Sequence, residues 1–214
     1  MSIKDLTQKS FSVLIIRSLG VLLLFGFTLF ITNFFTPENV GRYDFVRSAL
    51  MVLGGLALMG TNQSIIYYSG LLKARKSIES IRAVYSKMIK IICVLSFIVL
   101  ALYIVFFSQE KVNEFFNNEE SFSLLLKSIL TLFFFALTML NIDTIRALQK
   151  TVLSEMYRSL FRYLPVFFLA VVLLKFNQQA YLVEAYLTGF VLLSFFSSVR
   201  VYKIFKTLQK PNKK

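Results

Sequence analysis

The sequence predicts an all-α membrane protein, a polytopic bundle of six transmembrane helices with both ends of the chain in the cytoplasm. The first observation is apolar content: 57% of the 214 residues are hydrophobic, 16% are charged, and the mean hydropathy is +0.68. About 20 residues that rise 1.5 Å each cross a hydrocarbon core of roughly 30 Å. The second observation is that most of the 24 Lys and Arg residues lie in alternate connections between the apolar stretches.

The apolar stretches are long and uniform, which favours helices over strands. In lipid the backbone must satisfy its own hydrogen bonds, so only helices and closed barrels span a bilayer. Barrel strands alternate apolar and polar residues over about ten positions, and these stretches do not alternate. The predicted spans are residues 13–35, 43–72, 91–107, 122–142, 157–176 and 181–201.

The basic residues predict the orientation. They gather before the first span, in the connection 73–90, around residues 146–150 and in the C-terminal tail. Because cytoplasmic loops are enriched in Lys and Arg, these regions are expected inside, and the acidic loop 108–120 outside. The same sorting makes a lipid bilayer, rather than nucleic acid, the expected partner of a chain with a formal net charge of +13.

The connections add two local expectations. Pro37 follows the first span and predicts a turn, because proline cannot extend the preceding helix. In the connection 73–90, apolar residues recur at Ile78, Ile81, Val84 and Met88 between basic ones. This spacing predicts an amphipathic helix on the inner membrane surface, with a solvated linker as the alternative.

Charged residues inside the spans are the strongest functional signal, since a charge in mid-bilayer costs several kcal/mol and usually faces a cavity or a partner. Arg17 either extends to the cytoplasmic interface or faces a cavity. Arg47 lies three residues after Asp44 and either pairs with it or faces a cavity. Arg162 lies beside Pro165, where a kinked helix would suit a moving cavity wall.

The other polar residues in the spans are expected to contact neighbouring helices, a cavity or the membrane interface. Asn62 belongs to a run of four polar residues, 61–64, that either bonds neighbouring helices or lines an aqueous cavity. Asp143 and Arg146 share a helix face. Lys127 and Glu184 lie near the outer ends of their spans, which favours contact with the interface; the alternative for Glu184 is a proton-coupling site.

Catalytic chemistry is not expected. The chain has no histidine, so a His-based metal site or acid–base pair is excluded, and its one cysteine, Cys93, excludes an intrachain disulfide. Common nucleophile, phosphate-loop and metalloprotease motifs do not occur. We therefore expect no enzyme activity, no cofactor and no metal.

Several short motifs resemble a known family. The segments Arg17-Ser-Leu-Gly20 and Phe35-Thr-Pro-Glu-Asn-Val-Gly-Arg-Tyr43 resemble the N-terminal signature of polysaccharide (O-antigen type) flippases. These belong to the multidrug/oligosaccharidyl-lipid/polysaccharide exporter superfamily. The segments Leu56-Ala-Leu-Met-Gly60 and Asp143-Thr-Ile-Arg-Ala-Leu-Gln-Lys150 resemble later parts of the same pattern. Thr36 stands where the family usually has a small residue or glycine.

The resemblance implies a fold of two lobes around a cationic cavity that moves polyprenyl-pyrophosphate-linked sugars across the cytoplasmic (inner) membrane by alternating access. Residues 1–214 would form one six-helix lobe, so a homodimer or a separate second lobe would complete the transporter. The implied substrate residues are Arg17 and Arg47, with Arg162 and the cavity candidate Asn62 added from their positions. The alternatives are a non-transporting assembly partner in polysaccharide biosynthesis and a multidrug antiporter lobe.

Overall fold

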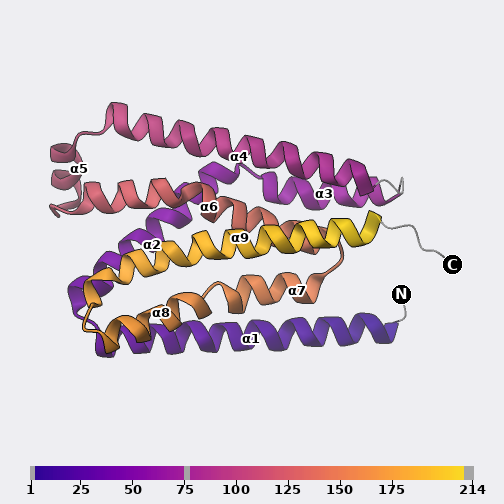
Figure 1. The fold of residues 1–214 in the computed structure, drawn as a ribbon, viewed down its shortest axis with the longest axis horizontal. Helices are drawn as coiled ribbons and strands as arrows, with labels where there is room; N and C mark the ends of the chain where they lie inside the picture. The colour runs from indigo at the N-terminus through magenta and orange to yellow at the C-terminus, as the bar shows by residue number, and fades with distance from the viewer. Residues whose placement is uncertain (1–2, 75–77, 210–214) are drawn as a thin grey trace.

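The computed structural model describes residues 3–74 and 78–209, and every element in these ranges is a helix (Figure 1). This confirms the all-α class for that part of the chain. The elements in order are α1 (Ile3–Phe34), α2 (Pro37–Leu58), α3 (Thr61–Ala74), α4 (Ile78–Phe106), α5 (Gln109–Phe116), α6 (Ser121–Ala147), α7 (Thr151–Met156), the π-helical turn η1 (Tyr157–Phe161), α8 (Leu164–Lys175), the 3₁₀ turn η2 (Gln179–Tyr181) and α9 (Leu182–Gln209).

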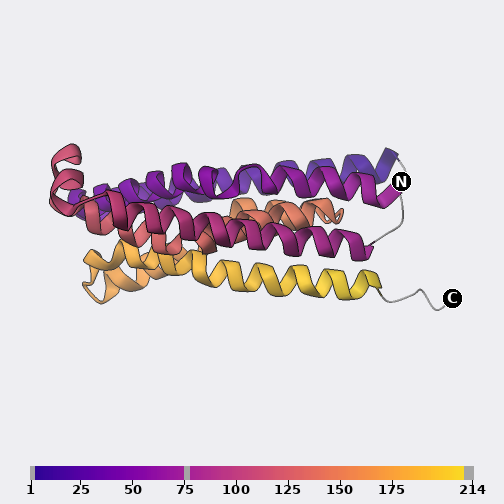
Figure 2. The ribbon, with the colours of Figure 1, turned by 90° about the horizontal axis from the view of Figure 1, so that it is seen from above.

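The helices are long and apolar enough for a multi-pass membrane protein. Five helical segments of the described chain qualify as spans, and α2 with α3 makes a sixth if this pair, bent by 48°, counts as one. The start of α1 and the end of α9 lie at the same end of the bundle (Figures 1 and 2). That placement agrees with an even number of crossings, and the cytoplasmic assignment of this end stays a prediction from the basic residues.

The predicted second span, 43–72, is two helices rather than one. The chain turns at Met59 and Gly60, whose φ angles of 38° and 76° lie in the left-handed region that glycine adopts at little cost. The polar run 61–64 therefore forms the first turn of α3, directly after this break. Polar residues suit this position, because the first backbone N–H groups of a helix lack partners within it.

The connection before the third span also differs from the expectation. Helix α4 begins at Ile78 and continues without a break to Phe106, so there is no separate surface helix in the described part. Ile81 and Met88 are buried, and the Tyr85 ring lies 5.8 Å from that of Phe205 in α9. The apolar face thus packs on the bundle and not on the membrane surface; residues 75–77 lie outside the described residues.

Helix α6 forms the centre of the bundle. It contacts α2, α3, α4, α7 and α9, and Leu132, Leu140 and Ile142 on it are fully buried. Helix α1, in contrast, packs along α7, η1 and α8 and leaves most of its apolar side chains exposed (Figure 1). In a membrane, lipid covers such a surface, so apolar exposure here is expected.

The end of the bundle opposite the chain ends is closed by α5 and two turns. Thr36 caps α2, since its hydroxyl accepts a bond from the Asn39 amide at 3.4 Å, and Pro37 is the first residue of the helix, as the predicted turn requires. The loop 108–120 contains α5, which lies across this end (Figure 1). The Phe116 ring on α5 lies 5.1 Å from that of Phe45 on α2.

A close helix contact joins α1 to η1. A Cβ atom at Gly20 would lie 2.5 Å from Ser159 Cβ and 2.7 Å from the Ser159 carbonyl oxygen. Backbone atoms cannot move aside cheaply, so only glycine fits at this position. On the same helix, a Cβ at Gly26 would meet nothing within 4 Å.

This contact predicts opposite effects for two glycine variants. Gly20→Ala should lower the free energy of unfolding by about 1–3 kcal/mol, because the added methyl group overpacks the contact with η1. Gly26→Ala should leave stability unchanged or raise it by up to about 1 kcal/mol, since alanine favours the helix. Thermal unfolding of both variants in the same lipid nanodiscs measures the difference, and equal melting temperatures would contradict the close contact.

Candidate functional site

The backbone is irregular where α7 continues towards α8. The π-helical turn Tyr157–Phe161 widens the helix, and α8 begins at Leu164 with Pro165 in its first turn. Proline has no N–H to donate, so the regular bonding is interrupted here. The π-helical turn and Pro165 interrupt the regular helix on both sides of Arg162, and π-helical turns are frequent at functional sites.

Arg162 lies among aromatic rings. Its guanidinium carbon is 5.7 Å from the ring centroids of Phe135 and Phe190 and 5.6 Å from that of Tyr163. It also interacts electrostatically with Tyr186. Its Nε is buried without a hydrogen-bond partner, and within residues 3–74 and 78–209 Arg162 forms no ion pair. Cation–π contacts compensate only part of the cost of placing a guanidinium there.

Arg47 forms the local pair with Asp44, one of the two alternatives that its sequence position offered. Its Nη2 lies 3.2 Å from Asp44 Oδ1, so the local pair is present. Asp44 is about half exposed, and the Arg47 guanidinium carbon also lies 5.9 Å from the Tyr43 ring on the interior side. The Arg47 Nε is buried and has no hydrogen-bond partner.

Arg47 and Arg162 belong to one cluster. The Tyr43 and Tyr186 rings lie 5.0 Å apart, Tyr186 and Phe190 are 5.2 Å apart, and both arginines interact electrostatically with Tyr186. The Tyr43 hydroxyl is buried and unpaired. We call this group the arginine–aromatic cluster. Its members are Tyr43, Arg47, Phe135, Arg162, Tyr163, Tyr186 and Phe190.

Arg17 lies in a different contact. Its Nε and Nη2 donate to the two carboxylate oxygens of Glu155, at 3.1 Å and 3.3 Å. Ser159, one turn later, also donates to Glu155 Oε1 at 2.9 Å. The Glu155 side chain is 10% exposed and that of Arg17 is 62% exposed. The structure thus joins α1 to α7 through Arg17 and does not place it in the arginine–aromatic cluster.

Asn62 is a link between helices. Its Nδ2 donates to Asp143 Oδ2 at 3.0 Å, and Arg158 forms an ion pair with Asp143 Oδ1. Asp143 is buried and Arg146 is exposed, so the partner of Asp143 is Arg158 rather than the neighbour on its own helix. Of the two roles expected for Asn62, the structure shows the bond to a neighbouring helix.

Sequence reasoning missed a third buried polar group, Asn141 in α6. Tyr85 of α4 donates to Asn141 Oδ1 at 2.5 Å, and Asn141 Nδ2 donates to Ser197 and Ser198 of α9, both at 2.9 Å. The sequence does contain a signal for this contact, because Asn141 is an amide within an apolar span. Neutral polar side chains in membrane helices commonly bond across helices.

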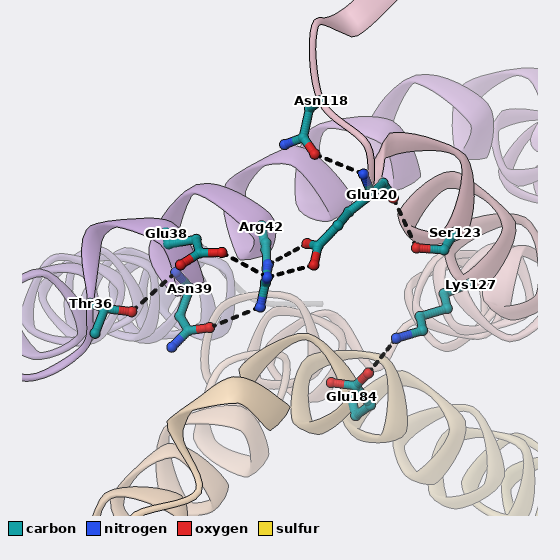
Figure 3. A network of polar contacts seen from close by, with 9 residues as sticks. All are labelled: Thr36, Glu38, Asn39, Arg42, Asn118, Glu120, Ser123, Lys127 and Glu184. Carbon is teal, nitrogen blue, oxygen red and sulfur yellow. Dashed lines mark hydrogen bonds and ion pairs between the residues drawn. The ribbon is translucent and has the colours of Figure 1, made fainter. Parts of the chain in front are cut away.

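Ion pairs hold the α5 end of the bundle together (Figure 3). Arg42 Nη2 is 2.8 Å from Glu38 Oε1, and its Nε is 2.5 Å from Glu120 Oε2, which joins α2 to the start of α6. Lys127 Nζ is 2.6 Å from Glu184 Oε1, which joins α6 to α9. Lys127 and Glu184 therefore bind each other, and both side chains remain partly exposed.

Comparison with known proteins adds no further assignment: no protein-family model, no curated protein and no solved structure matches the chain. The flippase resemblance therefore stays a prediction from the motifs. In the described ranges no three His, Cys, Asp or Glu side chains come together as metal ligands would. The arginine–aromatic cluster is the candidate site, because three of its buried donors, Arg47 Nε, Arg162 Nε and the Tyr43 hydroxyl, lack acceptors.

The two paired aspartates should respond differently to substitution. Asp143→Ala should lower the free energy of unfolding by about 1–3 kcal/mol, because it leaves Asn62 and the partly exposed Arg158 without their shared acceptor. Asp44→Ala, the matched control, should cost less than about 1 kcal/mol, since its pair is largely exposed. Chemical denaturation in mixed micelles compares them, and similar losses for both variants would contradict the buried role of Asp143.

Proposed function

We propose that this chain forms one lobe of a transporter that moves a lipid-linked oligosaccharide across the cytoplasmic membrane, with Arg47 and Arg162 binding the pyrophosphate of the lipid. One observation carries the proposal: Arg47 Nε, Arg162 Nε and the Tyr43 hydroxyl are buried donors without acceptors in one cluster. Buried polar groups are nearly always paired, so three unpaired donors together favour a missing acceptor.

The charge of the cluster favours an anion as that acceptor. It contains two guanidinium groups and no carboxylate; Asp44, which pairs with Arg47 from outside the cluster, is half exposed. Guanidinium groups form bidentate, charge-assisted bonds to phosphate oxygens, and these bonds strengthen where water is excluded. A pyrophosphate would offset the repulsion between the two cations and supply acceptors for both Nε groups.

The other two residues implied by the sequence have supporting parts in this proposal. Glu155 accepts two of the five N–H groups of Arg17, so three remain for a ligand at its exposed side. Arg17 is proposed as a substrate contact at the cytoplasmic end of the lobe. Asn62 is proposed as a positioning residue, because it holds Asp143, which in turn holds Arg158 on the π-helical turn that precedes Arg162.

Alternating access would need a second wall for the cavity and movable segments. The partner lobe is proposed to be a second copy or a separate chain, with the termini of each lobe in the cytoplasm. The interruptions at residues 59–60 and 157–163 lack regular helical bonding and suit hinges, since hinge residues lie where elements end.

Substitution of the two cluster arginines tests the proposal. Arg47→Gln and Arg162→Gln should each reduce export of the lipid-linked glycan about 10- to 100-fold, the equivalent of losing charge-assisted bonds of about 1.5–3 kcal/mol. The double variant should abolish export, and Arg146→Gln, which changes an exposed arginine, should not affect it. Surface polysaccharide in a complemented deletion strain is the measurement.

Two further readouts decide between transport and its alternative. Immunoblots of the membrane fraction show whether each variant is inserted, and binding of labelled polyprenyl pyrophosphate to purified protein in nanodiscs reports the site directly. Normal surface polysaccharide and unchanged binding in an inserted double variant would reject the proposal. A non-transporting assembly partner of polysaccharide biosynthesis would then be the better assignment.

A further inference from the structure

An apolar groove lies at the α5 end of the bundle, between α2, α4, α5 and α6. Its volume is about 640 Å³, within the range of about 300–1,000 Å³ that is usual for ligand sites. Leu53 and Leu56 of α2 and Val99 and Leu102 of α4 form its walls, and Phe115 of α5 lies at its rim. This groove contains none of the residues of the arginine–aromatic cluster.

The surroundings of the groove identify the kind of molecule that enters it. Helices α4 and α6 are membrane spans, and Leu56, Leu102 and Phe115 are strongly exposed. An apolar groove exposed on a membrane span faces lipid chains rather than water. Its lining along α4 runs from Val99 to Phe106, about 10 Å at 1.5 Å per residue, which accommodates the upper half of an acyl chain.

Two polar side chains line the groove, and one of them is satisfied. The Tyr103 hydroxyl donates to the Phe122 carbonyl oxygen at 3.0 Å. The other is Lys111, which is exposed on α5 and, within the described residues, belongs to none of the ion pairs. Helix α5 lies across the end of the bundle (Figure 1). Headgroups are expected at this level, because it is where the apolar spans end.

The charges next to Lys111 distinguish between headgroups. Glu110 precedes Lys111 and Glu114 follows it by one turn, and both carboxylates are exposed. Two acids beside one base disfavour a lipid with net negative charge. A headgroup with a phosphate and a primary ammonium group has a complementary partner for each of these charges.

We infer that this groove binds a zwitterionic phospholipid, with one acyl chain between α2 and α4, its phosphate on Lys111 and its ammonium group facing Glu110 and Glu114. The site is independent of the proposed transport function. It would brace α5 against α2 and α4 from the membrane side.

Native mass spectrometry of the full chain tests this site. The purified protein is mixed with equal amounts of phosphatidylethanolamine and phosphatidylglycerol that carry the same acyl chains. Wild-type protein should retain at least threefold more phosphatidylethanolamine. Lys111→Gln should reduce the retained phosphatidylethanolamine at least threefold. Lys175→Gln, which changes an exposed lysine elsewhere at the same end, should leave it unchanged.

Two more variants separate the chain from the headgroup. Leu56→Trp should fill the groove and lower retention of both lipids, and Glu110→Gln with Glu114→Gln should shift the preference towards phosphatidylglycerol. Preference of the wild-type protein for phosphatidylglycerol, equal behaviour of Lys111→Gln and Lys175→Gln, or unchanged retention in Leu56→Trp would each overturn the inference.

Discussion

The structure depends on one constraint: polar groups inside a bilayer must find partners within the protein. Apolar packing alone does not select one arrangement of helices in a membrane, because lipid tails are as apolar as leucine side chains. Helix α6 supplies the groups that do select it. Asn141 bonds α4 and α9, and Asp143 bonds α3 and the π-helical turn. The most contacted helix thus carries the polar side chains that fix its neighbours.

The same constraint separates the arginines by role. Arg17 and Arg158 each meet a largely buried carboxylate, and Arg42 meets two acids at the α5 end, so their charges are compensated within the chain. Arg47 has a half-exposed partner, and Arg162 meets aromatic rings and Tyr186 but no carboxylate among the described residues. Compensation within the protein indicates a structural role, whereas incomplete compensation leaves room for a ligand.

Sequence reasoning predicted what helix geometry encodes locally. Apolar length gave the all-helical membrane class, and three-residue spacing gave the Arg47–Asp44 pair. It missed the partners of Arg17 and Asp143, because the contact between Arg17 and Glu155 joins residues 138 positions apart and depends on how the helices pack. It also predicted one continuous segment over 43–72, since apolar residues on both sides of Gly60 continue the hydropathy signal through a left-handed turn.

The motif behind the family resemblance has a structural explanation in this chain. Arg17 and Gly20 lie one turn apart on α1, and they meet Glu155 and Ser159, one turn apart on the facing helical segment. The pattern therefore describes a helix contact whether or not the lobe transports a lipid. Arg47 and Arg162 are therefore the residues that distinguish a transporter from a scaffold. Helix packing accounts for neither of their unpaired Nε groups, and a phosphate would account for both.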